Sequence, residues 1–153
     1  MITTRAQFHE ALPDTFKRLL NLNQHVERMA EEHQVSLLTL ELVKIRCSQI
    51  NGCAYCADLH IGRALEFGEQ HRRIEMLPNW RETVLYSEQE RAALGLAESI
   101  SRLALTQEVS DAVYDEAARI FGEQQLAVVV WAIAEIQAFN ALNVTSRKPI
   151  TTP

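Results

Sequence analysis

Two cysteines and a histidine lie close together in the first half of the chain. Cys53 and Cys56 form a CxxC pair, and His60 follows the second cysteine by four residues. A CxxC pair closes a disulfide within one short turn, so it supplies a nucleophilic thiolate and a second thiol that resolves the oxidised product. The spacing i, i+3, i+7 places the three side chains on one face of a helix. These residues favour thiol redox chemistry.

A glycine marks the point where the motif opens a helix. Gly52 directly precedes the pair, so Cys53 and Cys56 are expected in the first helical turn. Unpaired backbone N–H groups and the helix dipole stabilise a thiolate there. A lone histidine is more often a partly exposed residue than a catalytic one, but the spacing of His60 from two cysteines favours a functional role.

A carboxylate stands on an apolar stripe twelve residues before the pair. The neighbours of Glu41 at helical spacing are Leu37, Leu38, Ile45 and Ser48. A buried carboxylate is unfavourable unless it is paired, and burial raises its pKa toward the range that proton transfer uses. The Asn51-Gly52 turn would fold this helix back and bring Glu41 near His60. A solvent-exposed glutamate at the helix edge fits the periodicity equally well, so both interpretations stay open.

Three further side chains are assigned from their surroundings in the sequence. Cys47 shares an apolar stripe, and free cysteine is among the most buried residue types, so core packing is expected. Tyr55 lies between the paired cysteines and is expected either to hydrogen-bond at the site or to pack. Glu135, inside an apolar helix, is expected to pair with a polar group across the core or a subunit interface.

Other uses of a CxxC pair fit this chain less well. A c-type haem site requires histidine directly after the second cysteine, where Ala57 stands. A structural zinc site requires four ligands, and no second CxxC or HxxxH motif is present. A Cys₃His set is conceivable from Cys47, Cys53, Cys56 and His60, with irregular spacing. A thioredoxin fold is disfavoured because no strand precedes the motif.

Composition bounds the class of protein and its partners. The 153 residues indicate one domain, and a net charge of −5 without a basic run argues against nucleic acid or an anionic membrane as a partner. The longest apolar run, 126–134, has nine residues, whereas a membrane-spanning helix needs about 20. Segment 2–14 lacks the apolar core of a signal peptide. Three cysteines without an export signal predict a reducing cytoplasm.

Helical periodicity dominates the chain and predicts an all-α fold. Glycine and proline total nine residues, and strand-like alternation is scarce. The expected helices are 14–33, 36–51, 53–68, 87–105, 110–121 and 123–142, with a short segment broken at Pro78-Asn79. Asp14, Ser36, Ser87 and Ser110 are the expected caps, and S-E-Q-E at 87–90 is a capping box. Gly122 is the expected break, and the tail from Ser146 is expected to be loose.

The stretch from Glu41 to His60, ELVKIRCSQINGCAYCADLH, resembles the AhpD-type alkylhydroperoxidase core of the carboxymuconolactone decarboxylase-like superfamily. It keeps the family's glutamate, the twelve-residue step, the CxxC pair and the following histidine. A weaker match is NWRE at 79–82 followed by SEQERAAL at 87–94. The resemblance covers about residues 13–147 of a single domain, 1–153.

The resemblance implies an all-α bundle with the CxxC pair at the N-terminus of a central helix, assembly into trimers or hexamers, and peroxidase activity without a cofactor or a metal. Cys56 resembles the peroxidatic cysteine, and Cys53 the resolving cysteine and proton donor. Glu41 and His60 resemble members of the proton relay. Tyr55 stands where the best-studied AhpD proteins have a second histidine. Lactone decarboxylation is disfavoured, because the family's decarboxylases generally lack the CxxC pair.

Two functions from different classes follow. The first is an antioxidant, thiol-dependent peroxidase of the peroxiredoxin type, which reduces a hydroperoxide to alcohol or water. Its partners would be the hydroperoxide and a dithiol, lipoyl or thioredoxin-like reductant. The alternative is a redox-sensing or zinc-stabilised interaction module without significant turnover. The apolar last helix and a hydrophobic content of 47% predict a homo-oligomer in either case.

Overall fold

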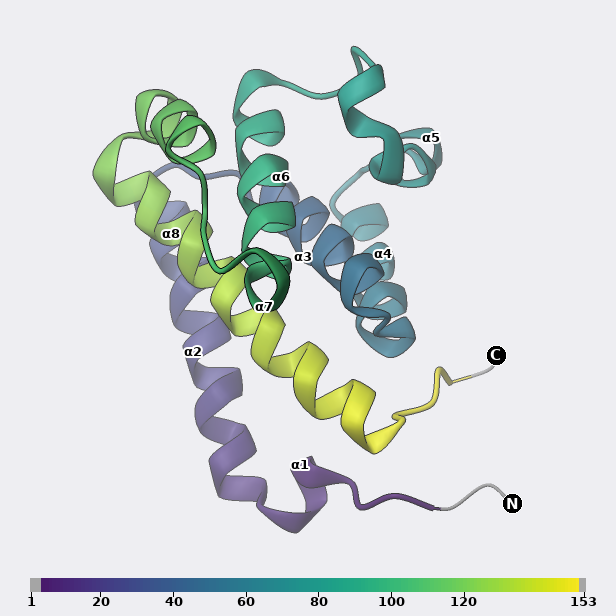
Figure 1. Ribbon diagram of the computed structural model, residues 1–153. Coiled ribbons are helices and arrows are strands. Elements are labelled where there is room, and N and C mark those ends of the chain that lie inside the picture. The colour runs from purple at the N-terminus through teal and green to yellow at the C-terminus, as the bar shows by residue number, and fades with distance from the viewer. Residues whose placement is uncertain (1–3, 152–153) are drawn as a thin grey trace.

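The computed structural model describes residues 4–151, and this range contains helices and no strand (Figure 1). The predicted all-α class is therefore confirmed. The elements in chain order are α1 (Phe8–Ala11), α2 (Pro13–Glu32), α3 (Leu37–Asn51), α4 (Ala54–Glu66), α5 (His71–Glu75), the 3-10 helix η1 (Leu77–Glu82), α6 (Glu88–Ser101), α7 (Leu103–Thr106) and α8 (Asp111–Ser146).

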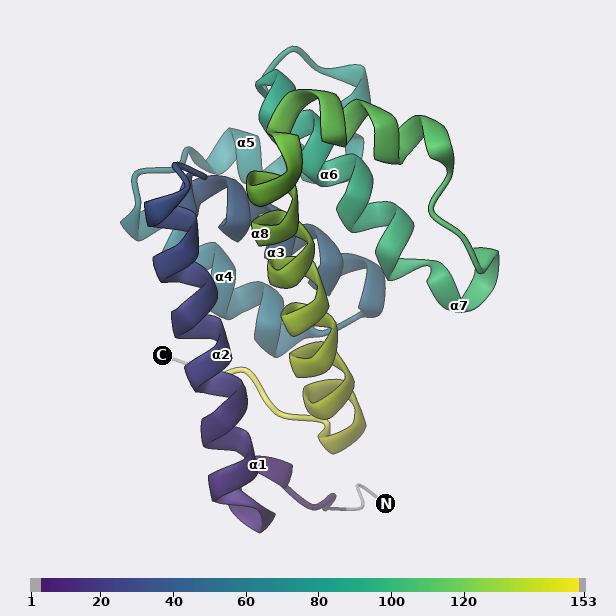
Figure 2. The same ribbon diagram turned by 90° about the vertical axis from the view of Figure 1, so that its left-hand side faces the viewer.

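Helix α3 occupies the centre of the bundle, between α4, α6 and α8 (Figure 1). Nine of its fifteen residues are buried, and they lie around the whole helix instead of along one stripe. Its polar residues must therefore find partners on the surrounding helices. Helix α2 packs against α8, and the second view shows the two helices side by side (Figure 2).

The connection between α3 and α4 positions the CxxC pair. Gly52 ends α3 in the left-handed conformation (φ 72°), which glycine adopts without strain. The N–H of Cys53 donates to the Ser48 carbonyl at 2.9 Å, and the chain reverses into α4. Helix α4 begins at Ala54, so Cys53 is its N-cap. The expectation that both cysteines lie within the first turn is wrong for Cys53, because its extended backbone (φ −87°, ψ 91°) precedes the helix.

Two other predicted helix starts are resolved by backbone geometry. The capping box at Ser87 is confirmed, since its hydroxyl accepts the N–H of Glu90 and its N–H donates to the Glu90 carboxylate. Asp14 is not the cap of α2. The helix begins one residue earlier at Pro13, whose fixed φ suits the first helical position. Asp14 instead lies in the first turn, where the helix dipole favours a carboxylate.

The predicted helix 87–105 is interrupted. Helix α6 ends at Ser101, Arg102 leaves the helical conformation (φ −107°, ψ 9°), and the short α7 follows. Neither glycine nor proline marks this break, so the sequence pattern does not reveal it. The other two predicted helix starts are confirmed. Ser36 directly precedes α3, without a side-chain cap bond, and Ser110 precedes α8, where its hydroxyl accepts the N–H of Val113.

Helix α8 joins two predicted helices. The expected break at Gly122 is present as a kink (φ 69°, ψ 179°), and the helix then continues to Ser146, beyond the predicted end near residue 142. Residues 147–151 of the predicted loose tail have no regular structure, and 152–153 lie outside the described residues, as do 1–3. The side chains of Arg5 and Gln7 donate to the Thr145 and Ser146 carbonyls, so the N-terminal segment is tied to the end of α8 (Figure 2).

Among the described helices, α8 alone is long and apolar enough to cross a membrane by length and composition. It packs against α2, α3 and α6, and its buried Glu135 and Asn140 contact polar groups of α3. A core helix of a bundle passes the same test. We therefore interpret α8 as a core helix.

Candidate active site

The two paired cysteines form a disulfide at the start of α4, with their Cα atoms 5.3 Å apart. Both residues are buried, at 3% exposure for Cys53 and 2% for Cys56. The backbone N–H of Cys56 donates to the Cys53 sulfur at 3.3 Å, which is the cap bond of the helix. The same N–H group would stabilise a thiolate on Cys53 after reduction.

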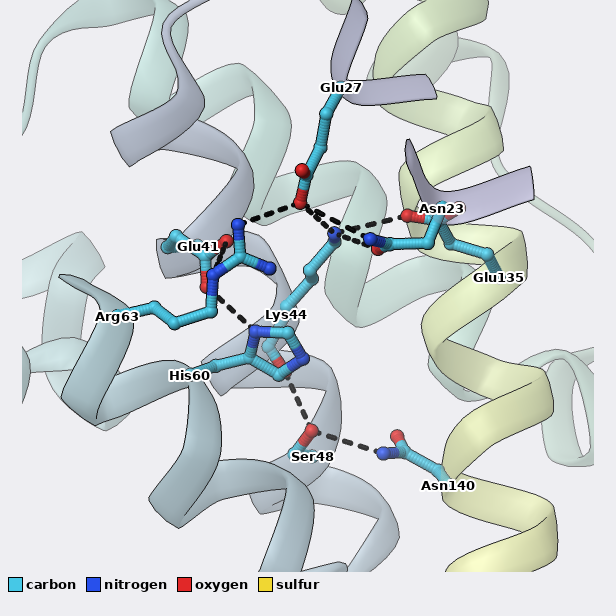
Figure 3. Close-up of polar contacts among 9 residues, drawn as sticks. All are labelled: Asn23, Glu27, Glu41, Lys44, Ser48, His60, Arg63, Glu135 and Asn140. Atoms are coloured by element: carbon cyan, nitrogen blue, oxygen red, sulfur yellow. Dashed lines mark hydrogen bonds and ion pairs between the residues drawn. The ribbon is translucent and has the colours of Figure 1, made fainter. Parts of the chain in front are cut away.

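Glu41 and His60 meet between α3 and α4. The Glu41 Oε2 atom lies 2.6 Å from His60 Nδ1, and the side chains are 2% and 6% exposed (Figure 3). The interpretation of Glu41 as an exposed helix-edge residue is therefore wrong, and the buried, paired one is confirmed. The reason is the central place of α3, which leaves Glu41 no path to solvent.

The pair has a defined protonation state. Burial acts to raise the pKa of Glu41, but the hydrogen bond with His60 and the nearby positive charges outweigh it, so the pKa is lowered. Burial lowers the pKa of His60 by more than Glu41 raises it. At neutral pH the site therefore holds a carboxylate and a neutral imidazole whose Nδ1–H donates to Glu41. The other ring nitrogen, Nε2, is then an unprotonated base.

A pocket of about 250 Å³ opens beside the pair, and Cys56 and His60 both line it. The remaining lining residues are Phe16, Leu20, Asn23, Tyr55, Leu59, Arg63, Ile136, Phe139, Asn143 and Lys148. Cys53 is not among them. The second cysteine of the pair and the imidazole thus face one mostly apolar cavity, where a small molecule could contact both.

Asn143 belongs to this site, although the sequence pattern did not single it out. Its Nδ2 donates to the Cys56 sulfur at 3.3 Å from α8, 87 residues away. Two more amide side chains of α8, those of Gln137 and Asn140, lie at helical spacing from Asn143. Both accept a hydrogen bond from Asn51 Nδ2, at 2.6 Å and 3.0 Å respectively. This row of amides in an otherwise apolar helix is the feature of the sequence that could have identified Asn143 as a site residue. It connects α8 to the turn that carries the cysteines.

Tyr55 packs at the rim of the pocket. The Lys148 ammonium lies 4.3 Å from the centroid of its ring, a cation–π contact. Within residues 4–151 the hydroxyl of Tyr55 makes no hydrogen bond. The packing interpretation therefore describes Tyr55 better than a hydrogen-bonding one.

A buried lysine organises the polar groups behind the site. Lys44 of α3 is 1% exposed, and its ammonium lies 3.0 Å from Glu135 and donates to Asn23 at 2.8 Å. Glu27 lies 3.9 Å from the same ammonium. The expected polar partner of Glu135 is therefore Lys44, within the chain. Burial raises the pKa of Glu135, although the Lys44 charge opposes this shift.

Arg63 links this lysine cluster to the glutamate–histidine pair. Its guanidinium donates to Glu27 at 2.8 Å and lies 3.6 Å from Glu41 (Figure 3). Three carboxylates, those of Glu27, Glu41 and Glu135, thus surround the two cations Arg63 and Lys44. With the imidazole neutral and all three carboxyl groups ionised, these five charged groups carry a formal net charge of −1.

Cys47 lies apart from the redox pair. It is fully buried, its thiol lies 3.9 Å from the Ala97 carbonyl of α6, and burial raises its pKa to about 11. The expected core packing is confirmed. In the described part of the chain, no three or more histidine, cysteine or acidic side chains gather as metal ligands would, so the Cys₃His arrangement is not formed.

Comparison with known proteins gives consistent relatives. The chain matches the Carboxymuconolactone decarboxylase family over residues 13–99. It is 33% identical over 143 residues to the uncharacterized protein YdfG of Bacillus subtilis (strain 168), covering 94% of each chain. A protein of unknown function from Agrobacterium tumefaciens, ATU0492, for which an AhpD antioxidant defence role has been suggested, superposes with a TM-score of 0.88 at 30% identity, over 99% of this chain and 100% of that one.

A more distant structure shares the fold. The debrominase Bmp8 superposes with a TM-score of 0.81 at 21% identity, over 94% of this chain and 74% of that one. The family and this neighbour are both named for enzymatic reactions. The family match includes Glu41, the CxxC pair and His60, and the fold agrees with the resemblance found in the sequence. The chain belongs to the carboxymuconolactone decarboxylase family, with an AhpD-like core.

Proposed function

We propose that the protein is a thiol-dependent peroxidase that reduces hydroperoxides through its Cys53–Cys56 pair. The observation that carries the proposal is one pocket lined by both the Cys56 thiol and a buried histidine held by a carboxylate. A thiol peroxidase needs a nucleophilic sulfur, a base that accepts its proton and an acid that returns it to the leaving oxygen. Cys56, His60 and Glu41 supply these groups.

In the first step the reduced Cys56 thiol loses its proton to Nε2 of His60. The thiolate attacks the terminal oxygen of the hydroperoxide, an S–O bond forms and the O–O bond breaks. The leaving alkoxide takes the proton from the imidazolium and departs as an alcohol, or as water when hydrogen peroxide is the substrate. Cys56 is oxidised to a sulfenic acid, and the hydroperoxide is reduced by two electrons.

In the second step the Cys53 thiol attacks the sulfenic sulfur of Cys56, and water leaves. The product is the disulfide present in this structure. Cys53 is close enough to resolve the intermediate without a large rearrangement, since the two Cα atoms are 5.3 Å apart. An external dithiol then reduces the disulfide, restoring both thiols and becoming a disulfide itself.

The assignment of Cys56 as the attacking sulfur is supported by two contacts. Cys56 lines the pocket and accepts a hydrogen bond from Asn143, whereas Cys53 does neither. A thioredoxin-type helix uses its first cysteine as the nucleophile, because that sulfur is exposed at the helix start. Here Cys53 is 3% exposed, which removes that advantage.

The reductant is proposed to be a lipoyl group, a thioredoxin-like protein or a small dithiol of the cytoplasm. Both cysteines are buried, so a slender dithiol that enters through the pocket suits the geometry better than a broad protein surface. A homo-oligomer, trimeric or hexameric, is also proposed. Its support is the apolar outer surface of α8, where Tyr114, Val130 and Trp131 are 53%, 37% and 56% exposed.

The deciding experiment follows hydroperoxide-dependent consumption of a dithiol such as dihydrolipoamide by the purified protein. Thiol titration before and after, with metal analysis of the same sample, separates the alternatives. Turnover by metal-free protein, with two thiols lost per chain after peroxide, supports the peroxidase. Absence of turnover with reversible disulfide formation indicates a redox sensor, and stoichiometric zinc with protected thiols indicates a zinc-stabilised module.

A further inference from the structure

The pocket beside Cys56 combines an apolar wall with positive charge. Its apolar side chains come from three helices: Phe16, Leu20, Leu59, Ile136 and Phe139. Two cationic side chains, Arg63 and Lys148, line it as well. Among the described residues that line the pocket, none is an aspartate or a glutamate. The cavity therefore suits a molecule that is apolar along its body and negative at one end.

The two cations are not equivalent. The Arg63 guanidinium already lies against Glu27 and Glu41, at 2.8 and 3.6 Å, so its charge is balanced within the protein. Lys148 forms no ion pair with any residue of the range 4–151. Its ammonium rests instead over the face of Tyr55, at 4.3 Å from the ring centroid. Lys148 is thus the lining cation whose charge remains available to a ligand.

Backbone geometry at the end of α8 brings Lys148 to this position. Arg147 adopts the left-handed conformation (φ 51°), and the N–H of Lys148 donates to the Asn143 carbonyl at 3.0 Å. This turn folds the chain back toward the start of α4. Tyr55, against which the ammonium packs, directly precedes Cys56. The charge therefore lies near the sulfur, and Asn143 contacts both parts of the arrangement through its carbonyl and its side chain.

We propose that Lys148 forms an anion subsite and that the physiological substrate is a compact hydroperoxide with an apolar body and a carboxylate. This inference deepens the proposed function and rests on it, because only a peroxidase would use the bound hydroperoxide as its substrate. A pocket of about 250 Å³ lies below the roughly 300–1,000 Å³ typical of sites for drug-sized ligands, so the apolar body is small. A carboxylate would share the ammonium with the face of Tyr55, and the apolar body would lie against the aromatic and aliphatic wall.

The test uses a matched set of hydroperoxides: cumene hydroperoxide carrying a para-carboxylate, and the methyl ester of the same compound. Because Lys148 is only half-buried, we expect the wild type to prefer the carboxylate by about 5- to 10-fold in KM, more than for a fully exposed ion pair. Lys148→Gln should bring the ratio of the two KM values close to one, Lys148→Arg should keep the preference, and Lys148→Glu should favour the ester.

Arg147→Gln is the matched control. It removes the same charge at the neighbouring residue, whose side chain does not line the pocket, and glutamine adopts the same left-handed conformation at Gln34 and Gln107 (φ 59° at both). It should keep the preference for the carboxylate. An equal KM for acid and ester in the wild type, or the same loss of preference in Arg147→Gln as in Lys148→Gln, would overturn the subsite.

A binding measurement keeps this inference separate from the peroxidase proposal. The redox-inert analogue para-isopropylbenzoate should slow alkylation of reduced Cys56 by neutral iodoacetamide, and its methyl ester should protect less. Protection by the carboxylate that is lost in Lys148→Gln supports the subsite even if no hydroperoxide is turned over, a result that would refute only the peroxidase. Equal protection by acid and ester rejects the subsite even if every hydroperoxide is reduced.

Discussion

The Glu41 carboxylate lies 2.6 Å from Nδ1 of His60 in the buried space between α3 and α4. This contact fixes which ring nitrogen carries the proton, and it leaves Nε2 as a base. Burial lowers the pKa of His60 despite the adjacent carboxylate, so the imidazole remains neutral below the pH at which a free histidine protonates. The pair is thus prepared to accept a thiol proton near neutral pH.

Glu41→Gln is expected to lower peroxide turnover by roughly 10²- to 10⁴-fold, the usual loss for an acid–base group, without unfolding the protein. Glutamine keeps the shape and a hydrogen bond to Nδ1, but it does not stabilise the imidazolium formed during the reaction. Turnover of Glu41→Gln, His60→Gln and the double variant is the measurement. Strong non-additivity means that Glu41 and His60 act as one proton relay. Wild-type activity in Glu41→Gln would show that Glu41 takes no part in proton transfer.

The lowered pKa of His60 also predicts how stability depends on pH. Between pH 6.5 and the lower folded-state pKa, the unfolded chain binds the His60 proton and the native protein does not. The free energy of unfolding should therefore fall as the pH falls through this window. Urea unfolding at a series of pH values checks the slope, and His60→Gln should flatten it. An unchanged slope in His60→Gln would show that other groups cause it.

Cys53→Ser and Cys56→Ser should both abolish turnover, by different routes. Cys53→Ser is expected to consume about one equivalent of hydroperoxide and to hold Cys56 as sulfenic acid or its over-oxidised products, because the resolving thiol is gone. Cys56→Ser should not consume this equivalent of hydroperoxide, because it lacks the attacking sulfur. Mass spectrometry after dimedone labelling identifies the oxidised residue. A stable adduct on Cys53 in Cys56→Ser, with none on Cys56 in Cys53→Ser, would reverse the assignment.

Asn143→Ala is expected to raise the pKa of the Cys56 thiol by about one to two pH units, since a hydrogen bond to a charged group contributes about 1.5–3 kcal/mol. Thiolate absorbance of the reduced Cys53→Ser protein is the measurement. Cys47 titrates separately, because burial raises its pKa to about 11. Gln137→Ala removes an amide of the same helix that does not contact Cys56 and serves as control. Equal titration curves for Asn143→Ala and Gln137→Ala would show that Asn143 does not stabilise the Cys56 thiolate.

Lys44→Met should lower the free energy of unfolding by about 3–5 kcal/mol, because it leaves the Glu135 carboxylate buried without its cation. Replacing both residues, in Lys44→Met/Glu135→Leu, should recover most of that loss. Urea unfolding measures both effects, with exposed Lys17→Met as a control expected within about 0.5 kcal/mol of the wild type. If the double variant does not recover the free energy of unfolding, Lys44 stabilises the protein mainly through Glu27 and Asn23.

The protein is expected to be an oligomer at micromolar concentration, held by the outer face of α8. Trp131 is 56% exposed beside an apolar hollow between α2 and α8 of about 380 Å³. Trp131→Glu should shift the mass seen by light scattering toward the monomer, while Val84→Glu, at a residue 99% exposed on another surface, should not. A monomeric wild type would contradict the expectation.

Local patterns in the sequence determined much of the fold. Helical periodicity predicted an all-α protein, and the capping box at Ser87, the turn at Gly52 and the kink at Gly122 are local features that backbone conformation enforces. The fixed spacing of Glu41, the CxxC pair and His60 was sufficient to identify the family. These signals depend on residues close in sequence, which is why the sequence alone carries them.

Tertiary packing decided the rest of the site. Periodicity could not choose between a buried and an exposed Glu41, because α3 is covered on all sides and has no single apolar face to reveal the answer. The contact of Asn143 with Cys56 spans 87 residues, and it exists because α8 crosses the start of α4 at one register. Lys148 reaches the pocket only through the left-handed turn at Arg147. Such contacts depend on how whole helices pack, and no short stretch of sequence specifies that packing.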